Sequence, residues 1–368
     1  MRKNITHLMI YGKFTEDYIN FINKYYGSDH VFYILGRGLN LINLKCNENI
    51  VIYNKLTLAR LIKILVSFYK SKKVILHSLF FSPKIILFIL FFYWRKRNIH
   101  IYFWGADIYN RYNATDKTKI DLHVNRIYSL FILSTGYTIN IIKEDYHELK
   151  KYVNHKHGCI IALYHDENLI KYINDNQSHR YTKGVNESTN ILVGNSSSIT
   201  NLHIDAYEKL SIYKNENIKV YSFLSYGDMN YRNSVIESGM QLFGNRYNPI
   251  TDYFDKQKFV NLYKTMDIAI FNNVRQEALF NIYTALALGV KVFLKFEGNM
   301  WLHFTRAGYD VYAIEDMINM KFLNFIEFTD KMKNMKIALD FLEVKNRKKE
   351  WDEVFLSKNK CREGNINE

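Results

Sequence analysis

The sequence contains few cysteines, and their spacing argues against one class of protein. Cys46, Cys159 and Cys361 are far apart and form no C-x-x-C pair. This usage argues against a disulfide framework and suits a reducing cytoplasm. We also expect no cleavable signal peptide, because residues 1–10 include two basic side chains and lack a long apolar core.

Several signature motifs of common enzyme classes are missing. There is no G-x-x-x-x-G-K-[ST] P-loop, no H-E-x-x-H helix, no G-x-S-x-G elbow and no D-x-D pair. Gly36 and Gly38 lack the third glycine of a dinucleotide fingerprint, which leaves a Rossmann oxidoreductase unsupported. His155, His157 and Cys159 lack a second ligand pair at zinc spacing. We therefore expect no metal and no cofactor.

A membrane-spanning helix is also not expected, although residues 74–94 are largely apolar. Five polar or helix-breaking residues interrupt this run, and a spanning helix needs about 20 apolar residues. We expect a strand over 73–80 and a helix over 84–94, with Ser82 as N-cap and Pro83 at the first helical position. Three basic residues follow this helix. Such a helix is either deeply buried or partly embedded in lipid, which favours a peripheral membrane protein.

The sequence is strongly basic and otherwise of ordinary globular composition. Lys and Arg number 50 against 36 Asp and Glu, which gives a formal charge of +14, and 48% of the residues are apolar. Nucleic acid, an anionic membrane surface and a phosphorylated substrate all suit this charge. Charge alone does not choose among them.

Short apolar runs alternate with helical patterns in both halves of the chain. This alternation predicts two α/β domains, each with a parallel sheet covered by helices. The predicted strands are 5–11, 30–35, 50–53, 73–80, 100–104, 190–193, 219–224, 268–272 and 290–295. The predicted helices are 16–26, 58–69, 84–94, 201–210, 256–265 and 278–288. The polar stretch 174–190 is the expected boundary. The expected domains are 1–175 and 190–318, and a helical tail, 319–368, is expected to pack back toward the first.

Two polar loops follow predicted strands of the second domain. In the first, Gly194-Asn195-Ser196-Ser197-Ser198 leads from a strand into a helix, where free N–H groups and hydroxyls favour a diphosphate. An ordinary capped turn explains this stretch equally well. In the second, Arg275 is suited to phosphate, and Gln276, Glu277 and Asn281 to ribose or sugar hydroxyls. The alternative for the second loop is a polar turn with a charged first helical turn.

Two further loops carry candidate functional residues. Asp107 follows the predicted strand 100–104, so its carboxylate can act as the base that a transferase needs. The alternative, that Asp107 caps the next helix, has about twice the weight. Tyr226 follows strand 219–224 and can stack on a nucleobase, although a plain loop is at least as well supported.

Four segments, taken together and in their order along the chain, resemble the 4-alpha-L-fucosyltransferase family. They are WGAD at 104–107, ILVGNSSSITNLH at 191–203, SYGD at 225–228 and RQEALFNI at 275–282. The similarity runs from about residue 5 to about residue 314. The chain departs from the family's pattern at Glu277 and Ala278, where the family has Gln and Gly.

The resemblance implies a GT-B fold, in which two Rossmann-like α/β domains face each other across a cleft. It also implies a dTDP-sugar donor carrying an N-acetylfucosamine-like (acetamido-dideoxyhexose) residue. The implied acceptor is an undecaprenyl-diphosphate-linked oligosaccharide of cell-surface polysaccharide synthesis, such as that of enterobacterial common antigen. The implied location is the cytoplasmic face of the inner membrane. Residues 194–198 and 275–277 would contact the donor, and Asp107 would lie near the acceptor.

Three alternatives remain at the level of the sequence. A GT-B transferase that uses another nucleotide sugar for capsule or O-antigen would need the same motifs. A non-enzymatic nucleic-acid binder fits the charge, but the basic residues are dispersed and no recognised binding motif occurs, so we expect no nucleic-acid partner. A membrane scaffold could retain the fold without activity.

Overall fold

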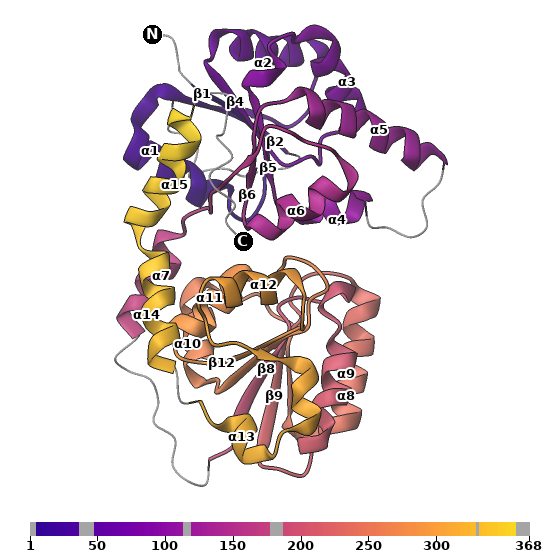
Figure 1. Ribbon diagram of the computed structural model, residues 1–368, viewed down its shortest axis with the longest axis vertical. Helices are drawn as coiled ribbons and strands as arrows, with labels where there is room; N and C mark the ends of the chain where they lie inside the picture. The colour runs from indigo at the N-terminus through magenta and orange to yellow at the C-terminus, as the bar shows by residue number, and fades with distance from the viewer. Residues whose placement is uncertain (1–4, 37–47, 113–118, 177–186, 329–330, 358–368) are drawn as a thin grey trace. The chain divides into compact units, whose positions relative to one another are not determined.

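The computed structural model describes residues 5–36, 48–112, 119–176, 187–328 and 331–357 (Figure 1). The chain divides into unit 1, Met1–Glu167 with Val344–Glu368, and unit 2, Asn168–Glu343. The division falls at the first residue of helix α7 (Glu167–Asn176), ahead of the polar stretch 174–190 that is the boundary expected from the sequence. The middle of that stretch lies outside the described residues.

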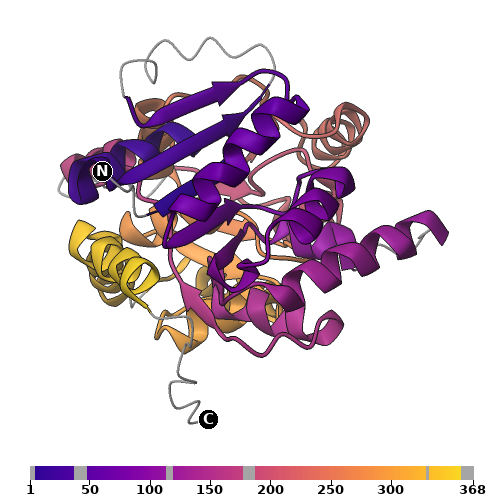
Figure 2. The same ribbon diagram turned by 90° about the horizontal axis from the view of Figure 1, so that it is seen from above.

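The described strands of unit 1 form one parallel sheet in the order β3-β2-β1-β4-β5-β6-β7 (Figure 2). They are β1 (Ile5–Ile10), β2 (His30–Leu35), β3 (Ile50–Tyr53), β4 (Lys73–His77), β5 (Ile99–Phe103), β6 (Thr138–Asn140) and β7 (Cys159–Ile161). Every residue of β4 and β5 is buried, which explains why apolar residues predominate in their sequences, KVILH and IHIYF. The strand order reverses between β1 and β4, where loops of such sheets usually bind ligands.

The helices of unit 1 pack their apolar sides on this sheet. They are α1 (Thr15–Tyr26), α2 (Leu58–Lys70), α3 (Pro83–Phe92), α4 (Ala106–Tyr112), α5 (Lys119–Ser134), α6 (Lys143–Tyr152) and α15 (Val344–Leu356). Helix α2 shows the principle: the side chain of its N-cap, Thr57, accepts from the backbone N–H of Arg60, and one face of the helix is buried.

The apolar run at 74–94 forms a strand and a separate helix. Strand β4 ends at His77, three residues before the predicted end, and α3 begins with Pro83 in its first turn. Ser82 occupies the N-cap position, but its side chain makes no capping hydrogen bond. Among the described residues, no helix combines the length and apolar character needed to cross a membrane.

Helix α15 returns from the end of the chain to complete unit 1, where it lies beside α1 (Figure 1). Trp351 is fully buried, and its indole N–H donates to the backbone oxygen of Leu163 at 3.0 Å. The ammonium of buried Lys73 donates to the oxygens of Val354 at 2.6 Å and Ser357 at 3.0 Å. Lys73 therefore satisfies carbonyls that the last turn of α15 leaves without helical partners.

Unit 2 has a second parallel sheet, in which the described strands follow the order β10-β9-β8-β11-β12-β13. They are β8 (Thr189–Val193), β9 (Ile218–Phe223), β10 (Tyr247–Ile250), β11 (Ile268–Phe271), β12 (Lys291–Leu294) and β13 (Tyr312–Ala313). Its helices, beside α7, are α8 (His203–Leu210), α9 (Met229–Phe243), α10 (Lys256–Thr265), α11 (Leu279–Ala287), α12 (Asn299–Arg306), α13 (Phe322–Ile326) and α14 (Lys331–Leu342). Here the order reverses between β8 and β11.

The helix predicted over 201–210 begins later than expected. A short 3₁₀ turn, Ile199–Asn201, comes first, and Leu202 then adopts a left-handed conformation with φ +46°. This conformation interrupts the helical path, so α8 begins only at His203.

Candidate functional site

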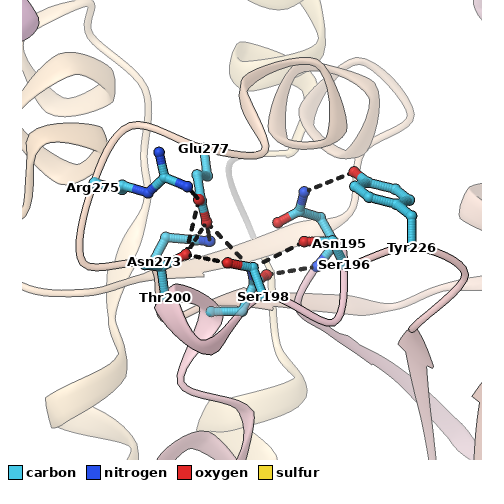
Figure 3. A network of polar contacts seen from close by, with 9 residues as sticks. Asn195, Ser196, Ser198, Thr200, Tyr226, Asn273, Arg275 and Glu277 are labelled. Carbon is cyan, nitrogen blue, oxygen red and sulfur yellow. Dashed lines mark hydrogen bonds and ion pairs between the residues drawn. The ribbon is translucent and has the colours of Figure 1, made fainter. Parts of the chain in front are cut away.

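The two polar loops of the second domain lie next to each other in unit 2. One follows β8 and the other follows β11, and these neighbouring strands pair in register with Val193 opposite Ile270. The backbone N–H of Val274 in the second loop also donates to the oxygen of Thr200 in the first, at 3.1 Å. The loops therefore meet at the point where the strand order reverses, which is the usual ligand position in a parallel sheet (Figure 3).

Gly194 allows a close approach, but the group that approaches belongs to the protein itself. Its φ is +70°, and a Cβ atom at this position would lie 2.1 Å from Nε2 of His203. His203 is fully buried, and this burial lowers its pKa to about 3, so the ring is neutral. Glycine is required here because the loop passes directly over this imidazole.

Most of the predicted hydroxyl donors are hydrogen-bonded within the site. Ser197 donates from its hydroxyl to the backbone oxygen of Tyr226 at 2.7 Å. Ser198 and Thr200 join their hydroxyl oxygens at 2.7 Å, and Thr200 in turn donates to Glu277. The hydroxyls thus hold the loops in place, which limits what they can offer to a ligand.

Arg275 and Glu277 form an ion pair, and their side chains are only 14% and 13% exposed. The Glu277 carboxylate also accepts from Asn273 of its own loop and from Thr200 and Asn201 of the loop after β8. Figure 3 shows these contacts converging on one carboxylate. The pair therefore joins the two loops into one polar network.

Four buried polar atoms of the two loops have no hydrogen-bond partner in the part of the chain that the structure describes. They are Oδ1 of Asn195, Oδ1 of Asn272, Oδ1 of Asn273 and Nε of Arg275. Buried polar groups are nearly always hydrogen-bonded, so three acceptors and one cationic donor left in adjoining loops indicate a binding position. Within the described residues, no group of three or more His, Cys, Asp or Glu side chains is placed to hold a metal ion.

The remaining predicted residues lie around this network in different ways. Tyr226 is 46% exposed, and its hydroxyl lies 3.4 Å from Nδ2 of Asn195. Burial of the hydroxyl end raises the pKa of Tyr226. Gln276 lies between Arg275 and Glu277 in the sequence, and its side chain is buried. Asn281 accepts instead from the hydroxyl of Tyr263 on α10, at 3.0 Å.

Asn201 and Asn273 belong to the site although the sequence prediction did not include them. Asn201 links the segments of its loop: its Oδ1 accepts from the backbone N–H of Asn195 at 2.9 Å, and its Nδ2 donates to Glu277. Asn273 is the second residue after β11, and its Nδ2 donates to Glu277 at 3.0 Å. Two polar residues immediately after a buried strand, Asn272 and Asn273, were the available signal for Asn273.

Asp107 lies in unit 1, near the start of α4, and is only 1% exposed. Its two carboxylate oxygens accept from the backbone N–H groups of Trp104 at 3.0 Å and Leu79 at 3.1 Å. Burial raises the pKa of Asp107 to about 6, while these two N–H groups act in the opposite direction. Asp107 therefore joins the loops after β4 and β5, a structural role that differs from the helix cap offered by the sequence as the alternative to catalysis.

Comparison with solved structures identifies the fold. A glycosyltransferase from Rickettsia africae has a TM-score of 0.66 at 13% identity, covering 96% of this chain and 98% of that one. HepE from Anabaena, in complex with UDP and glucose, has a TM-score of 0.65 at 13% identity, with 96% and 100% covered. Sucrose-phosphate synthase from Thermosynechococcus elongatus gives 0.66 at 9% identity, with 96% and 98% covered. The two parallel-sheet units are thus of the GT-B type.

Sequence comparison supplies the family. No curated protein sequence matches the chain. The model of the family described as 4-alpha-L-fucosyltransferase, glycosyl transferase group 56, matches residues 22–359, which is most of the chain. With the GT-B fold, this match means that the protein is a glycosyltransferase, an enzyme that uses a nucleotide-sugar donor and a glycan acceptor. The chain belongs to the 4-alpha-L-fucosyltransferase family of glycosyltransferases, group 56.

Proposed function

We propose that this enzyme transfers an N-acetylfucosamine-like residue from a dTDP-sugar to an undecaprenyl-diphosphate-linked oligosaccharide. The observation that carries the proposal is the family match over residues 22–359. The loops after β8 and β11 support the donor half of it. They combine the guanidinium of Arg275 with buried amide oxygens that lack partners in the described residues. Arg275 would neutralise part of the diphosphate charge that develops as the sugar leaves.

Tyr226 supplies a surface for the nucleobase in this proposal. It follows β9, the strand beside β8, and nearly half of its side chain is exposed. A base stacked on a tyrosine typically gains about 1–3 kcal/mol. We expect Tyr226→Ala to weaken binding of the complete nucleotide while leaving binding of inorganic pyrophosphate unchanged, as measured by calorimetry.

The direct test is turnover with defined substrates. The purified enzyme should transfer sugar from a dTDP-acetamido-dideoxyhexose to an undecaprenyl-diphosphate-linked acceptor. The same sugar carried on UDP should react at least tenfold more slowly. Equal or faster turnover with the UDP-linked sugar would favour the alternative, a GT-B transferase that uses another nucleotide sugar for capsule or O-antigen. The structure of HepE in complex with UDP is the reason for testing this alternative.

Asp107 is proposed as the catalytic base, with the loop-fixing role as its alternative. A pKa of about 6 suits a group that is deprotonated at neutral pH and accepts a proton from an acceptor hydroxyl. Its two backbone hydrogen bonds favour the alternative. Asp107→Asn separates them, because an amide can still accept a hydrogen bond through its oxygen but cannot act as the base.

If Asp107 is the base, the Asn variant loses turnover at every pH, and it does so under conditions in which the variant remains folded. If Asp107 fixes the loops, the variant loses thermal stability, because the amide nitrogen of Asn faces a backbone donor. In that case its residual activity follows the stability loss. Near-native rate and stability together would exclude both roles.

We further propose that unit 1 binds the anionic inner membrane through an outer patch on α2 and α3. The patch is made of side chains that are at least 44% exposed: Leu58, Ile62, Val66, Phe91, Phe92 and Trp94. The first three recur every fourth residue along α2 and therefore share one helix face. The two helices adjoin, since the rings of Tyr69 and Trp94 lie 4.7 Å apart. Apolar patches of this kind mark interaction surfaces.

The charges around the outer patch select a lipid surface as its occupant. Lys63 and Lys70 are exposed on α2, and Arg95 and Arg97 are exposed just after α3. Each basic side chain near an anionic leaflet adds roughly 1 kcal/mol of attraction. An apolar face surrounded by basic residues is typical of peripheral membrane proteins.

Vesicle sedimentation tests the membrane proposal. The native enzyme should bind vesicles containing phosphatidylglycerol more tightly than vesicles of phosphatidylcholine alone. The triple variant Ile62→Ser, Phe91→Ser, Trp94→Ser should lose most of this binding. The matched control, Ile318→Ser with Leu323→Ser, removes exposed apolar side chains from unit 2 and should bind like the native enzyme. Equal binding by both variants would exclude the outer patch, and a monomer formed only by the triple variant would assign the patch to a dimer.

A further inference from the structure

The carboxylate of Glu277 receives more donors than any other side chain of the site. Oε1 accepts from Nη2 of Arg275 and lies 2.8 Å from the Thr200 hydroxyl. Oε2 lies 2.9 Å from the same hydroxyl, 3.0 Å from Nδ2 of Asn273 and 3.2 Å from Nδ2 of Asn201. A carboxylate offers about four acceptor positions, so the protein itself fills the capacity of Glu277.

The Glu277 carboxylate also fixes the direction of the hydrogen bonds around it. Thr200 has one hydroxyl hydrogen, and an ionised carboxylate can only accept, so that hydrogen points toward Glu277. Ser198, 2.7 Å from the Thr200 oxygen, must therefore donate to it. The amide of Asn201 directs its two hydrogens to Glu277 and to Oγ of Ser196. One carboxylate thus orients the side chains of Ser198, Thr200 and Asn201 in the first loop.

Glu277 also determines how much positive charge Arg275 presents. The guanidinium and the carboxylate are both largely buried, so water screens their attraction weakly. An anion that binds at Arg275 must share the guanidinium with Glu277 and must tolerate a second negative charge nearby. The unpartnered Nε of Arg275 shows that the guanidinium keeps a donor for such a ligand among the described residues.

We infer that Glu277 is a positioning residue that holds Arg275 as a built-in counter-ion, and so limits the affinity for a nucleoside diphosphate. In this role Glu277 shapes the two loops and favours release of the nucleoside diphosphate once the sugar has been transferred. This differs from a direct contact between Glu277 and ribose or sugar hydroxyls, because the carboxylate has no acceptor position left for them. The inference rests on the proposed use of a nucleotide-sugar donor.

The test compares Glu277→Gln with the native enzyme in calorimetric titrations of dTDP and of thymidine. Gln keeps the shape of the side chain and one acceptor oxygen but removes the charge. We expect dTDP to bind about tenfold more tightly, as expected when a nearby like charge is removed, and thymidine to bind unchanged. The ratio of the two affinities separates a charge effect from a general change in loop shape.

Controls keep the inference falsifiable. Glu216→Gln removes the same charge from the turn before β9, at the opposite edge of the sheet, and should leave both affinities unchanged. In an Arg275→Gln background, the gain from Glu277→Gln should shrink markedly, because the counter-ion no longer has a cation to restrain. If Glu277→Gln alone folds poorly, the double variant, which removes both members of the buried pair, is compared with Arg275→Gln alone and should bind dTDP with the same affinity.

Two results would overturn the inference. Unchanged or weaker dTDP binding by Glu277→Gln, with the native enzyme binding dTDP, would show that Glu277 contacts the ligand or is indifferent to it. An equal gain for thymidine would show that loop shape, not charge, is responsible. Failure of the native enzyme to bind any nucleoside diphosphate would instead overturn the proposed function.

Discussion

The two units share a strand order but place their buried polar groups differently. In unit 2 these groups gather in loops at the carboxyl ends of β8 and β11, where they form the network around Glu277. In unit 1 a chain of imidazoles crosses the sheet itself. His7, on β1, lies 2.9 Å from His30, on β2, and 2.9 Å from His77, at the end of β4. Polar groups in the loops of unit 2 are placed to bind a ligand, whereas the imidazoles inside the sheet of unit 1 bind to other side chains of the protein.

Two arrangements of protons fit the chain in unit 1. If Tyr164 donates to Nδ1 of His77, then Nε2 of His77 donates to His7 and Nε2 of His7 donates to His30; if Tyr164 accepts, all three bonds run the other way. Every imidazole in the chain is neutral in both arrangements. An extra proton on His7 would place two N–H groups against each other, so the chain depends on pH.

Acidification should produce the largest difference between the units. Among the described residues of unit 1, burial lowers the pKa of each of the six buried histidines: His7, His30, His77, His100, His155 and His165. It raises the pKa of three carboxyls: Asp107, Asp145 and Glu350. In the described part of unit 2, only His203 shows a comparable lowering, to about 3.

The sign follows from the protons that each state binds. Histidines with folded pKa values below 6.5 stabilise the fold above pH 6.5, and this stability is lost as the pH falls toward 4, because the unfolded chain binds those protons. The three carboxyls oppose this loss. Six histidines less three carboxyls leave a net difference of about three protons between the unfolded and folded states. The free energy of unfolding therefore falls by about 4 kcal/mol for each pH unit of acidification. Pulsed hydrogen exchange at a fixed labelling pH should show unit 1 opening before unit 2; simultaneous opening would contradict the comparison.

Gly194→Ala should have the next largest effect. It tests the packing of the loop after β8 in unit 2. The added Cβ would meet the His203 ring in a backbone conformation that side chains rarely adopt. We expect a loss of about 3 kcal/mol or more in the free energy of unfolding. Gly244→Ala is the matched control, because its φ is +57° but nothing lies within 4 Å of the new Cβ. It should cost about 1 kcal/mol in urea unfolding. Equal losses would mean that the loop moves away from His203.

The two buried lysines test a feature that the units share. Lys73 begins β4 and donates to the end of α15, while Lys291 begins β12 and donates to the oxygens of Asn324 and Glu327, each at 2.8 Å. Each Met substitution should cost about 2 kcal/mol, because helix-end carbonyls lose a charged donor. Limited proteolysis should release α15 only in Lys73→Met. Release of α15 in both variants would show that the two units do not unfold separately.

Ala278→Gly should have the smallest effect and the opposite sign. Ala278 has φ +59° at the N-cap of α11, a conformation that glycine adopts without strain. We expect this substitution to stabilise unit 2 by about 0.5–1 kcal/mol in urea unfolding, with dTDP affinity unchanged. Destabilisation would show that the methyl group packs usefully in the site loop.

Strands with strong apolar patterns were predictable from the sequence, and strands with a very short or interrupted pattern were not. The predictions for β2 and β3 match the structure residue for residue. Strand β6 was missed because its three residues, Thr138–Asn140, carry too little pattern. Strand β10 was missed because it contains Pro249, which a sheet tolerates at its edge, where this strand lies.

For the site, the sequence indicated the correct loops but not the contacts between their side chains. The spacing of Gly194 and Arg275 after their strands placed both at one sheet edge, as observed. The sequence could not show that Glu277 pairs with Arg275, or that the Thr200 hydroxyl points inward, because both depend on side-chain directions set by tertiary packing. Likewise, Asp107 follows its strand as predicted, but its bond to the N–H of Leu79 depends on the loop after β4.

The central claim is that the loops after β8 and β11 bind the diphosphate of the donor. Calorimetric titration of dTDP into the native enzyme and into Arg275→Gln tests this claim most directly. The account predicts measurable binding by the native enzyme and at least tenfold weaker binding by the variant. No binding of dTDP, UDP or GDP by a folded native enzyme, or equal dTDP affinity of the two proteins, would contradict it.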